Sequence, residues 1–135
     1  MGGMNTESLI RTYYQLFNAK DVSGFLELLT DDVIHEISQG GSESGKGTFG
    51  RFMEHMNRCY DERVYELAVM VSADGSRAAA EFMLDGTYLA QDGNLPPAHG
   101  QKYTLRVGAF FEIEGGKVAR IANHYNMKDW LRQVG

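Results

Sequence analysis

The stretch YYQLFNAKDVSGFLELLTDDVIHE, residues 13–36, changes its hydrophobic period twice within a short length of chain. Its first part completes a helical pattern, predicted over residues 5–20, in which apolar side chains recur every three or four positions. A second, short helix is predicted over residues 22–29, and strand-like alternation follows over residues 33–37. The stretch therefore predicts two amphipathic helices that lead into a β-strand.

The rest of the chain continues this order. A Gly/Ser-rich loop is followed by a third predicted helix over residues 48–60, and then the period changes from 3.6 to 2. Four strand-like runs follow, over residues 64–73, 76–90, 101–114 and 117–127, and residues 128–133 predict a closing helical turn. We predict one domain over residues 1–135, with an α+β fold in which a curved, mostly antiparallel sheet packs against three N-terminal helices. A sheet of this curvature encloses a cone, and an open cone is a pocket.

Composition excludes several classes of partner. The 135 residues carry a net charge of -5 without a stripe of Lys and Arg, so no nucleic-acid partner is expected. No apolar run approaches ~20 residues, so no membrane association is expected either. The single cysteine cannot form an internal disulfide, which is typical of a reducing compartment, and we expect a cytoplasmic protein.

Neither a cofactor nor a metal ion is expected from the motifs. The loop GGSESGKGT, residues 40–48, resembles a phosphate-binding loop, but Gly47 stands where the Ser or Thr that binds magnesium should be. The four histidines form no recognisable i, i+4 pair, and a carboxylate triad is not evident near them. His55 is expected to be exposed beside the apolar face of the third helix.

Two candidate polar residues lie on predicted apolar faces. His35 shares its strand face with Val33 and Ile37, so it is either a structural histidine bonded to a backbone carbonyl or a pocket-lining proton carrier. Tyr13 is central in the apolar stripe of the first helix, and Tyr14 lies to its side. Tyr13 is either a core aromatic residue or a hydrogen-bond donor to a developing oxyanion.

The strand region supplies further candidates. Glu81 and Arg106 lie on the polar faces of neighbouring runs, where hairpin pairing is expected to bring Asp85 near Arg106. Such charges are either an exposed surface pair or a charged pocket lining. Asn123 and Tyr125 share one face of the last run, as a polar pocket wall or as a dimer contact.

At this point the order of motifs resembles a known family. Residues 13–36, GKGTFGRFMEHMNRCY, LPPAHGQ and GAFFEIEGGKVARI are similar to steroid Δ-isomerases and SnoaL-like polyketide cyclases of the NTF2-like superfamily. The similarity covers nearly the whole chain, and it is greatest to bacterial ketosteroid isomerase-related proteins. It implies an NTF2-like cone, a homodimer formed through the outer face of the sheet, and a small hydrophobic ligand.

The resemblance does not carry over an intact ketosteroid isomerase site. Those enzymes use a tyrosine and a protonated aspartate as an oxyanion hole, and a second aspartate as the base. The tyrosine corresponds to Tyr13, but Ile37 stands at the position of the base, and Ala109 at or beside that of the oxyanion aspartate, with Gly108 next to it. We therefore expect no true steroid Δ-isomerase activity.

The catalytic residues of a second group in the superfamily are also only partly present in this chain. Limonene-epoxide-hydrolase relatives place an Arg and two Asp around a water molecule. Arg106 matches the first of these, whereas Gly108 and Asn123 replace the aspartates. Neither known mechanism is intact in this chain.

The sequence leaves open whether the protein is an enzyme. If it is, we expect a cofactor-independent isomerase or cyclase for a small hydrophobic carbonyl compound, with Tyr13 as donor and His35 as proton shuttle. His35 lies two residues before Ile37, about 7 Å along the same strand face. The remaining substrate contacts are expected from Ile37, Glu81, Arg106, Ala109, Asn123 and Tyr125. The alternatives are a non-catalytic ligand-binding module and a dimeric adaptor whose cone is filled by its own side chains.

Overall fold

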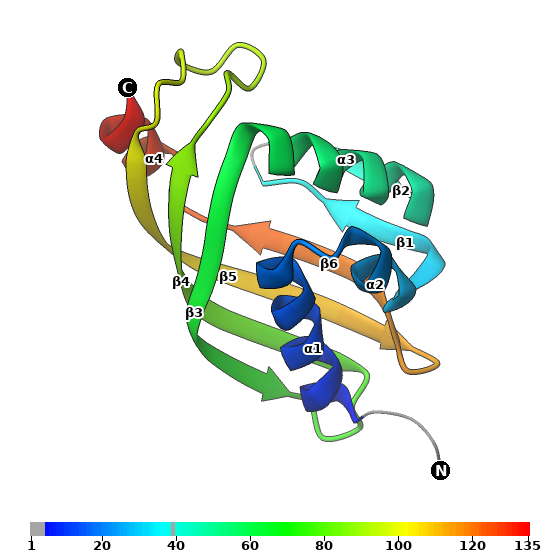
Figure 1. Ribbon diagram of the computed structural model, residues 1–135. Coiled ribbons are helices and arrows are strands. Elements are labelled where there is room, and N and C mark those ends of the chain that lie inside the picture. The colour runs from blue at the N-terminus through cyan, green and yellow to red at the C-terminus, as the bar shows by residue number, and fades with distance from the viewer. Residues whose placement is uncertain (1–4, 39) are drawn as a thin grey trace.

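The computed structural model describes residues 5–38 and 40–135. Over these residues, three helices lie on one face of a curved sheet, and a fourth helix lies at one end of it (Figure 1). The helices are α1 (Thr6–Ala19), α2 (Val22–Glu27), α3 (Lys46–Cys59) and α4 (Met127–Val134). The strands are β1 (Leu29–Glu36), β2 (Ser42–Ser44), β3 (Tyr60–Val71), β4 (Arg77–Tyr88), β5 (Lys102–Glu114) and β6 (Lys117–His124). The predicted α+β architecture is confirmed.

The sheet has the strand order β2-β1-β6-β5-β4-β3. All neighbouring strands are antiparallel except β1 and β6, which are parallel. The register of β3 against β4 shifts between Tyr65 and Ala68, where Glu66 has a left-handed φ of 53°. A second shift separates Glu112 and Ile113 in β5. Bulges of this kind bend a strand, and the long strands curve around the helices in Figure 1.

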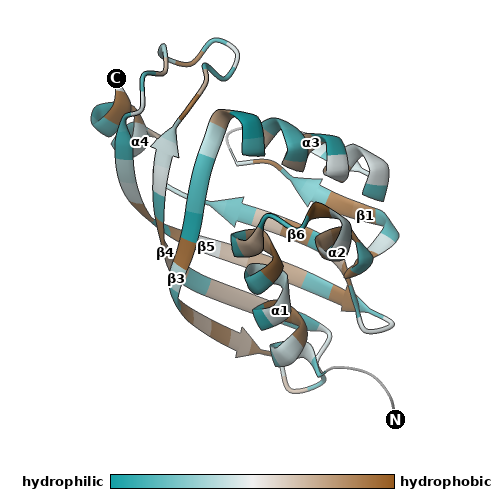
Figure 2. Ribbon diagram, in the orientation of Figure 1, coloured by the Kyte–Doolittle hydropathy of each residue, from teal (hydrophilic) through white to brown (hydrophobic). Residues whose placement is uncertain are grey.

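Alternation along the strands gives the sheet two different faces. In β4, buried and more exposed residues alternate from end to end, with Phe82 and Leu84 toward the helices and Glu81 and Asp85 away from them. Hydrophobic and hydrophilic residues are correspondingly interspersed along the long strands in Figure 2. The concave face packs against α1, α2 and α3 to form the core, and the convex face is left open in the single chain.

The ends of the first three helices differ from the sequence prediction by at most two residues. Asn5 caps α1 by accepting a hydrogen bond from the Ser8 amide (2.8 Å), whereas the Thr6 hydroxyl donates to the carbonyl of Gly75 (2.7 Å). Helix α2 ends at Glu27 because Leu29 pairs with Val118 and begins β1. The helical pattern continues to residue 29, but pairing with a residue distant in the sequence ends the helix two residues earlier.

Helix α4 is longer than the predicted closing turn, and it covers one end of the sheet. Its buried Trp130 packs edge-on against the rings of Tyr88 and Tyr103, with centroids 5.2 and 6.0 Å away. The ring of Tyr103 lies directly over Gly86, where a Cβ atom would be 2.2 Å from it. Only glycine leaves room for this arrangement. No helix in the described ranges is long and apolar enough to cross a lipid bilayer.

Candidate functional site

A cavity of about 390 Å³ lies between the helices and the concave face of the sheet. Its wall is mainly aromatic, aliphatic and thioether side chains, among them Phe17, Phe25, Phe52, Met53, Met56 and Val107. Polar side chains interrupt this wall at a small number of positions. A largely apolar cavity with few polar groups is typical of a site for a small organic molecule.

Two tyrosines of α1 lie at the cavity. Tyr13 packs against Phe25 (centroids 4.4 Å apart), and Tyr14 packs against Phe82 (4.7 Å). The Tyr14 hydroxyl is buried and makes no hydrogen bond among the described residues. Burial raises the pKa of both phenols, so both remain protonated hydrogen-bond donors at neutral pH. Tyr14 was expected to lie to the side, but the cavity is wide enough for both rings to reach its wall.

His35 projects from β1 into the same wall and is only 2% exposed. Its ring stacks on Phe49, with centroids 4.3 Å apart and planes 6° from parallel. Its Nδ1 lies 3.1 Å from Oε1 of Glu43, which stands directly opposite on β2. The partner is thus a carboxylate and not the backbone carbonyl that a purely structural histidine was expected to have.

The surroundings of His35 determine its charge. Burial lowers its pKa, and the hydrogen bond and negative charge of Glu43 oppose this shift only in part. The imidazole is therefore neutral at pH 7. Donation from Nδ1–H to Glu43 would select one tautomer and leave Nε2 as a proton acceptor.

Ile37 and Tyr125 border the cavity just beyond the ends of β1 and β6, and Asn123 borders it from the last residues of β6. The parallel pairing of these strands, with His35 opposite Ile121, brings their ends to the same place. Burial raises the pKa of Tyr125, and the negative charges of Glu62 and Asp92 add to this effect. Together with Tyr13 and His35, these three residues share one cavity.

Three other predicted contact residues lie elsewhere. Glu81 and Arg106 project from the convex face, where they form an exposed ion pair at 3.7 Å, because their strand neighbours occupy the concave face. Arg106 stands opposite Met83 rather than near Asp85, which pairs with Thr104. Ala109 is fully buried opposite Asn123 and is not part of the cavity wall.

Glu62 is a cavity residue that the sequence analysis missed. It accepts a hydrogen bond from the Tyr103 hydroxyl (2.5 Å), and burial raises its pKa although that bond opposes the shift. The predicted strand began at Val64, whereas β3 begins at Tyr60. The alternation of Tyr60, Glu62 and Val64 was the local signal that would have placed this carboxylate on the concave face.

Asp92 is a second missed residue, on the loop between β4 and β5. Its carboxylate accepts a hydrogen bond from the Tyr60 hydroxyl and contacts Nε2 of His55, each at 2.7 Å. His55 was expected to be solvent-exposed, but its side chain is 42% exposed and paired. No local pattern predicts this contact, because the partners are 37 positions apart.

The curved sheet, the helices on its concave face and the enclosed cavity define an NTF2-like domain. A sequence model of the SnoaL-like domain matches residues 10–121, and the chain belongs to this family. Among proteins with curated functions, none matches the chain.

Solved structures agree with this assignment. A candidate polyketide cyclase from Pseudomonas putida is 55% identical, with a TM-score of 0.97 over 98% of this chain and 100% of its own. A candidate polyketide cyclase from Xanthomonas campestris is 37% identical, with a TM-score of 0.93 over 96% of each chain. An NTF2-like protein of unknown function from Burkholderia pseudomallei has a TM-score of 0.82 at 19% identity, over 97% of this chain and 98% of its own, and shows the shared fold alone.

Proposed function

We propose that this protein is a cofactor-independent enzyme of the isomerase or cyclase type, acting on a small hydrophobic carbonyl compound in the cavity. The observation that carries the proposal is His35, a buried and neutral imidazole that is paired with Glu43 on an apolar cavity wall. Histidine is the side chain whose ordinary pKa lies nearest neutral pH, and burial lowers the pKa of His35 and so keeps it in the neutral form that accepts a proton. The similarity to candidate polyketide cyclases supports the same class of reaction.

In the proposed mechanism, His35 Nε2 removes a proton from the carbon next to the carbonyl group. The C–H electron pair forms a C=C bond to the carbonyl carbon and the C=O π pair moves to the oxygen, so an enolate forms as the imidazole becomes an imidazolium. Glu43 holds the ring and stabilises this positive charge, as the carboxylate does in a catalytic triad. Where a C=C bond is conjugated with the enolate, return of the proton to its far carbon shifts the double bond and isomerises the substrate. Where the enolate carbon instead attacks a second carbonyl of the substrate, a ring closes, and the imidazolium gives its proton to the alkoxide that forms.

The tyrosines are suited to bind the enolate oxygen. Within the described residues the buried Tyr14 hydroxyl has no hydrogen-bond partner, and Tyr13 lies next to it at the cavity. A phenol that donates only when charge develops on the substrate lowers the barrier more than one that binds the ground state equally well. We assign the orientation of the substrate to Asn123 and Tyr125, with Ile37 as an apolar contact.

Two observations argue against alternatives. A cavity of about 390 Å³ argues against an adaptor whose cone is filled by its own side chains. Ile37 at the position of the isomerase base, and Ala109 at or beside that of the oxyanion aspartate, argue against steroid Δ-isomerase activity. A non-catalytic ligand-binding module shares the cavity with the enzyme, and only a chemical test separates these two.

The test follows exchange of a carbon-bound proton. The bicyclic ketone β-tetralone is incubated with the protein in D₂O, and loss of its α-proton signal is measured by NMR, while its binding is measured separately. We expect exchange faster than in buffer of the same composition. Binding of the ketone without faster exchange would favour the ligand-binding module. If the ketone shows no binding and no faster exchange, the proposal is contradicted.

We also propose that the protein is a homodimer formed through the convex face. Met70, Ala79 and Phe110 are consecutive partners across β3, β4 and β5, and they form an apolar row on this face. Met70 and Phe110 are each 52% exposed in the single chain. Arg120 nearby pairs with Glu36 and Glu112, so the apolar row has a charged border, as interfaces commonly do.

A further inference from the structure

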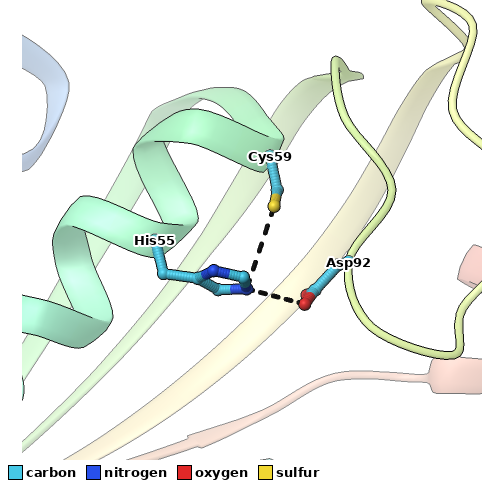
Figure 3. A group of neighbouring side chains, drawn as sticks. All are labelled: His55, Cys59 and Asp92. Carbon is cyan, nitrogen blue, oxygen red and sulfur yellow. Dashed lines mark hydrogen bonds and ion pairs between the residues drawn. The ribbon is translucent and has the colours of Figure 1, made fainter.

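Three side chains with metal-binding atoms converge where α3 meets the loop between β4 and β5 (Figure 3). His55 and Cys59 are one helical turn apart on α3, and Asp92 comes from the loop. Cys59 Sγ lies 3.8 Å from His55 Nε2, which lies 2.7 Å from Asp92 Oδ1. The three ligand atoms all lie within 4.8 Å of one another.

The geometry differs from that of a Cys-His-Asp nucleophile. In such a relay, the thiol contacts one imidazole nitrogen and the carboxylate contacts the other. Here the thiol and the carboxylate approach the same nitrogen, Nε2 of His55. Burial and the charge of Asp92 also raise the pKa of the Cys59 thiol, whereas an activated cysteine needs a lowered one. Three ligand atoms of these types within 4.8 Å of one another are instead typical of ligands around a cation.

We propose that His55, Cys59 and Asp92 bind a divalent transition-metal ion of the zinc class, at a site that does not include His35, and this inference does not rest on the proposed function. Thiolate, imidazole and carboxylate are the usual protein ligands of Zn²⁺. A thiolate ligand favours Zn²⁺ or Co²⁺ over Mg²⁺ or Ca²⁺, which prefer oxygen.

Two of the three ligand separations lie on either side of the value for a tetrahedral site. Usual zinc bond lengths place ligand atoms roughly 3.3–3.6 Å apart. The separation of 3.8 Å between Cys59 and His55 is near this value. The contact of 2.7 Å between His55 and Asp92 would have to open by less than about 1 Å to admit the ion.

Neighbouring groups hold the ligands in place. The carbonyl of Cys59 accepts hydrogen bonds from the amides of Leu89 (2.7 Å) and Ala90 (3.3 Å), which tie the start of the loop to the end of α3. The Tyr60 hydroxyl donates to Oδ2 of Asp92 and leaves Oδ1 toward His55. Outer-shell partners of this kind orient the ligands of metal sites.

Binding would change the protonation of the site in a defined way. The thiol proton of Cys59 is released to solvent, and the thiolate and the Asp92 carboxylate then balance the two charges of the ion. Three protein ligands leave a fourth position for water. No metal site was expected from the sequence because the histidines form no i, i+4 pair with one another, whereas this i, i+4 pair joins a histidine and a cysteine.

The site is tested with metal ions alone. Protein stripped with a chelator is titrated with Zn²⁺ by calorimetry, and with Co²⁺ while the absorption spectrum is recorded. We expect one equivalent to bind, with a thiolate-to-cobalt charge-transfer band. Cys59→Ala should abolish the band and weaken Zn²⁺ binding at least ~10-fold, the smallest loss usual even for an outer-shell partner.

Two further variants keep the test clear of folding effects. Asp92→Asn retains the shape of the side chain and an oxygen for Tyr60, yet it should also weaken Zn²⁺ binding. His99→Ala removes an exposed histidine outside the cluster and should bind as the wild type does. Zn²⁺ should raise the melting temperature of the wild type and of His99→Ala, but not of Cys59→Ala.

The absence of a stoichiometric ion in the wild type would overturn the proposal, and so would unchanged affinity in both Cys59→Ala and Asp92→Asn. The proton-exchange assay with β-tetralone, run on the metal-free protein, is a separate measurement. Failure of the metal site therefore leaves the proposed reaction at His35 untouched, and the reverse also holds.

Discussion

The two faces of the sheet carry polar residues in different ways. On the concave face, His35 and Glu62 lie among aromatic rings, and burial shifts the pKa of each against its charged form. On the convex face, Glu81 and Arg106 form an ion pair whose side chains are more than half exposed. The same alternation places both sets, but only the concave set is removed from water. A polar strand residue is therefore a candidate for chemistry only when its face is covered.

The largest expected effect comes from His35→Leu. We expect the exchange of β-tetralone protons to fall about 10²–10⁴-fold, the usual contribution of a positioned general base. The fold should be kept, and the melting temperature should stay the same or rise, because functional polar groups are often held at a cost in stability. The matched variant Arg106→Leu, on the convex face, should leave the exchange unchanged. A lower melting temperature with unchanged exchange would make His35 structural.

Phe110→Asp tests whether the convex face is covered in solution. Loss of a central aromatic anchor from an interface typically costs about 2 kcal/mol or more, which is roughly 30-fold in the dissociation constant. Sedimentation at micromolar concentration should give a dimer for the wild type and a shift toward the 15.1 kDa monomer for the variant. Leu89→Asp, a half-exposed apolar residue outside the row, is the control. A wild type that sediments only as a monomer would rule out the dimer.

Gly86→Ala and Gly108→Ala compare the faces at the level of packing. A Cβ at Gly86 meets the ring of Tyr103 at 2.2 Å, so we expect a loss of about 1–3 kcal/mol of stability from overpacking. A Cβ at Gly108, on the convex face, meets no atom within 4 Å, so that variant should be neutral or slightly stabilised. Chemical denaturation measures both. If the two variants change the free energy of unfolding equally, the ring of Tyr103 moves aside from a Cβ at Gly86 without cost.

The pH dependence of stability isolates the buried imidazole. The pKa of His35 is lowered in the folded protein, so below its unfolded value of about 6.5 the unfolded chain binds more protons. The contribution of His35 to stability is therefore complete above about pH 6.5 and is lost as the pH falls below that value. The curve for His35→Leu should therefore fall less steeply than the wild-type curve between pH 7 and acidic conditions. Parallel curves from urea denaturation would contradict this assignment.

Glu43→Gln extends this pH test. The carboxylate raises the pKa of His35, so its removal should lower that pKa further and steepen the acid loss. His99→Leu, which removes an exposed imidazole outside this pair, is the matched control variant. A Glu43→Gln curve that is shallower than the wild-type curve would contradict this expectation, because it would mean that Glu43 does not raise the pKa of His35.

Arg106→Ala should have the smallest effect. An exposed ion pair contributes under about 1 kcal/mol, and salt screens it. Denaturation at low and high salt should show a small difference from the wild type that shrinks as salt is added. A larger, salt-independent loss would mean that Arg106 is covered in the native assembly.

Much of the fold followed from local pattern. The helical spacing in α1 and α3 and the alternation in β4 and β5 predicted the element types and their buried faces, because these periods are properties of the backbone geometry. The ends of elements were less accurate. Helix α2 ends early because Leu29 pairs with Val118, and β3 begins early because Tyr60 pairs with Tyr88. Those contacts form between residues far apart in the chain, so a local window does not contain them.

The sequence by itself determined the order of elements and the side-chain set of each face, including His35 and Tyr13 on the covered face. The tertiary structure decided which polar groups meet. Glu43 reaches His35 through strand pairing, Tyr103 reaches Glu62 across the concave face, and Asp92 reaches His55 from a loop. The physical reason is that the side-chain period is set by each residue and its neighbours, whereas these encounters depend on register, bulges and loop paths that the whole chain fixes together.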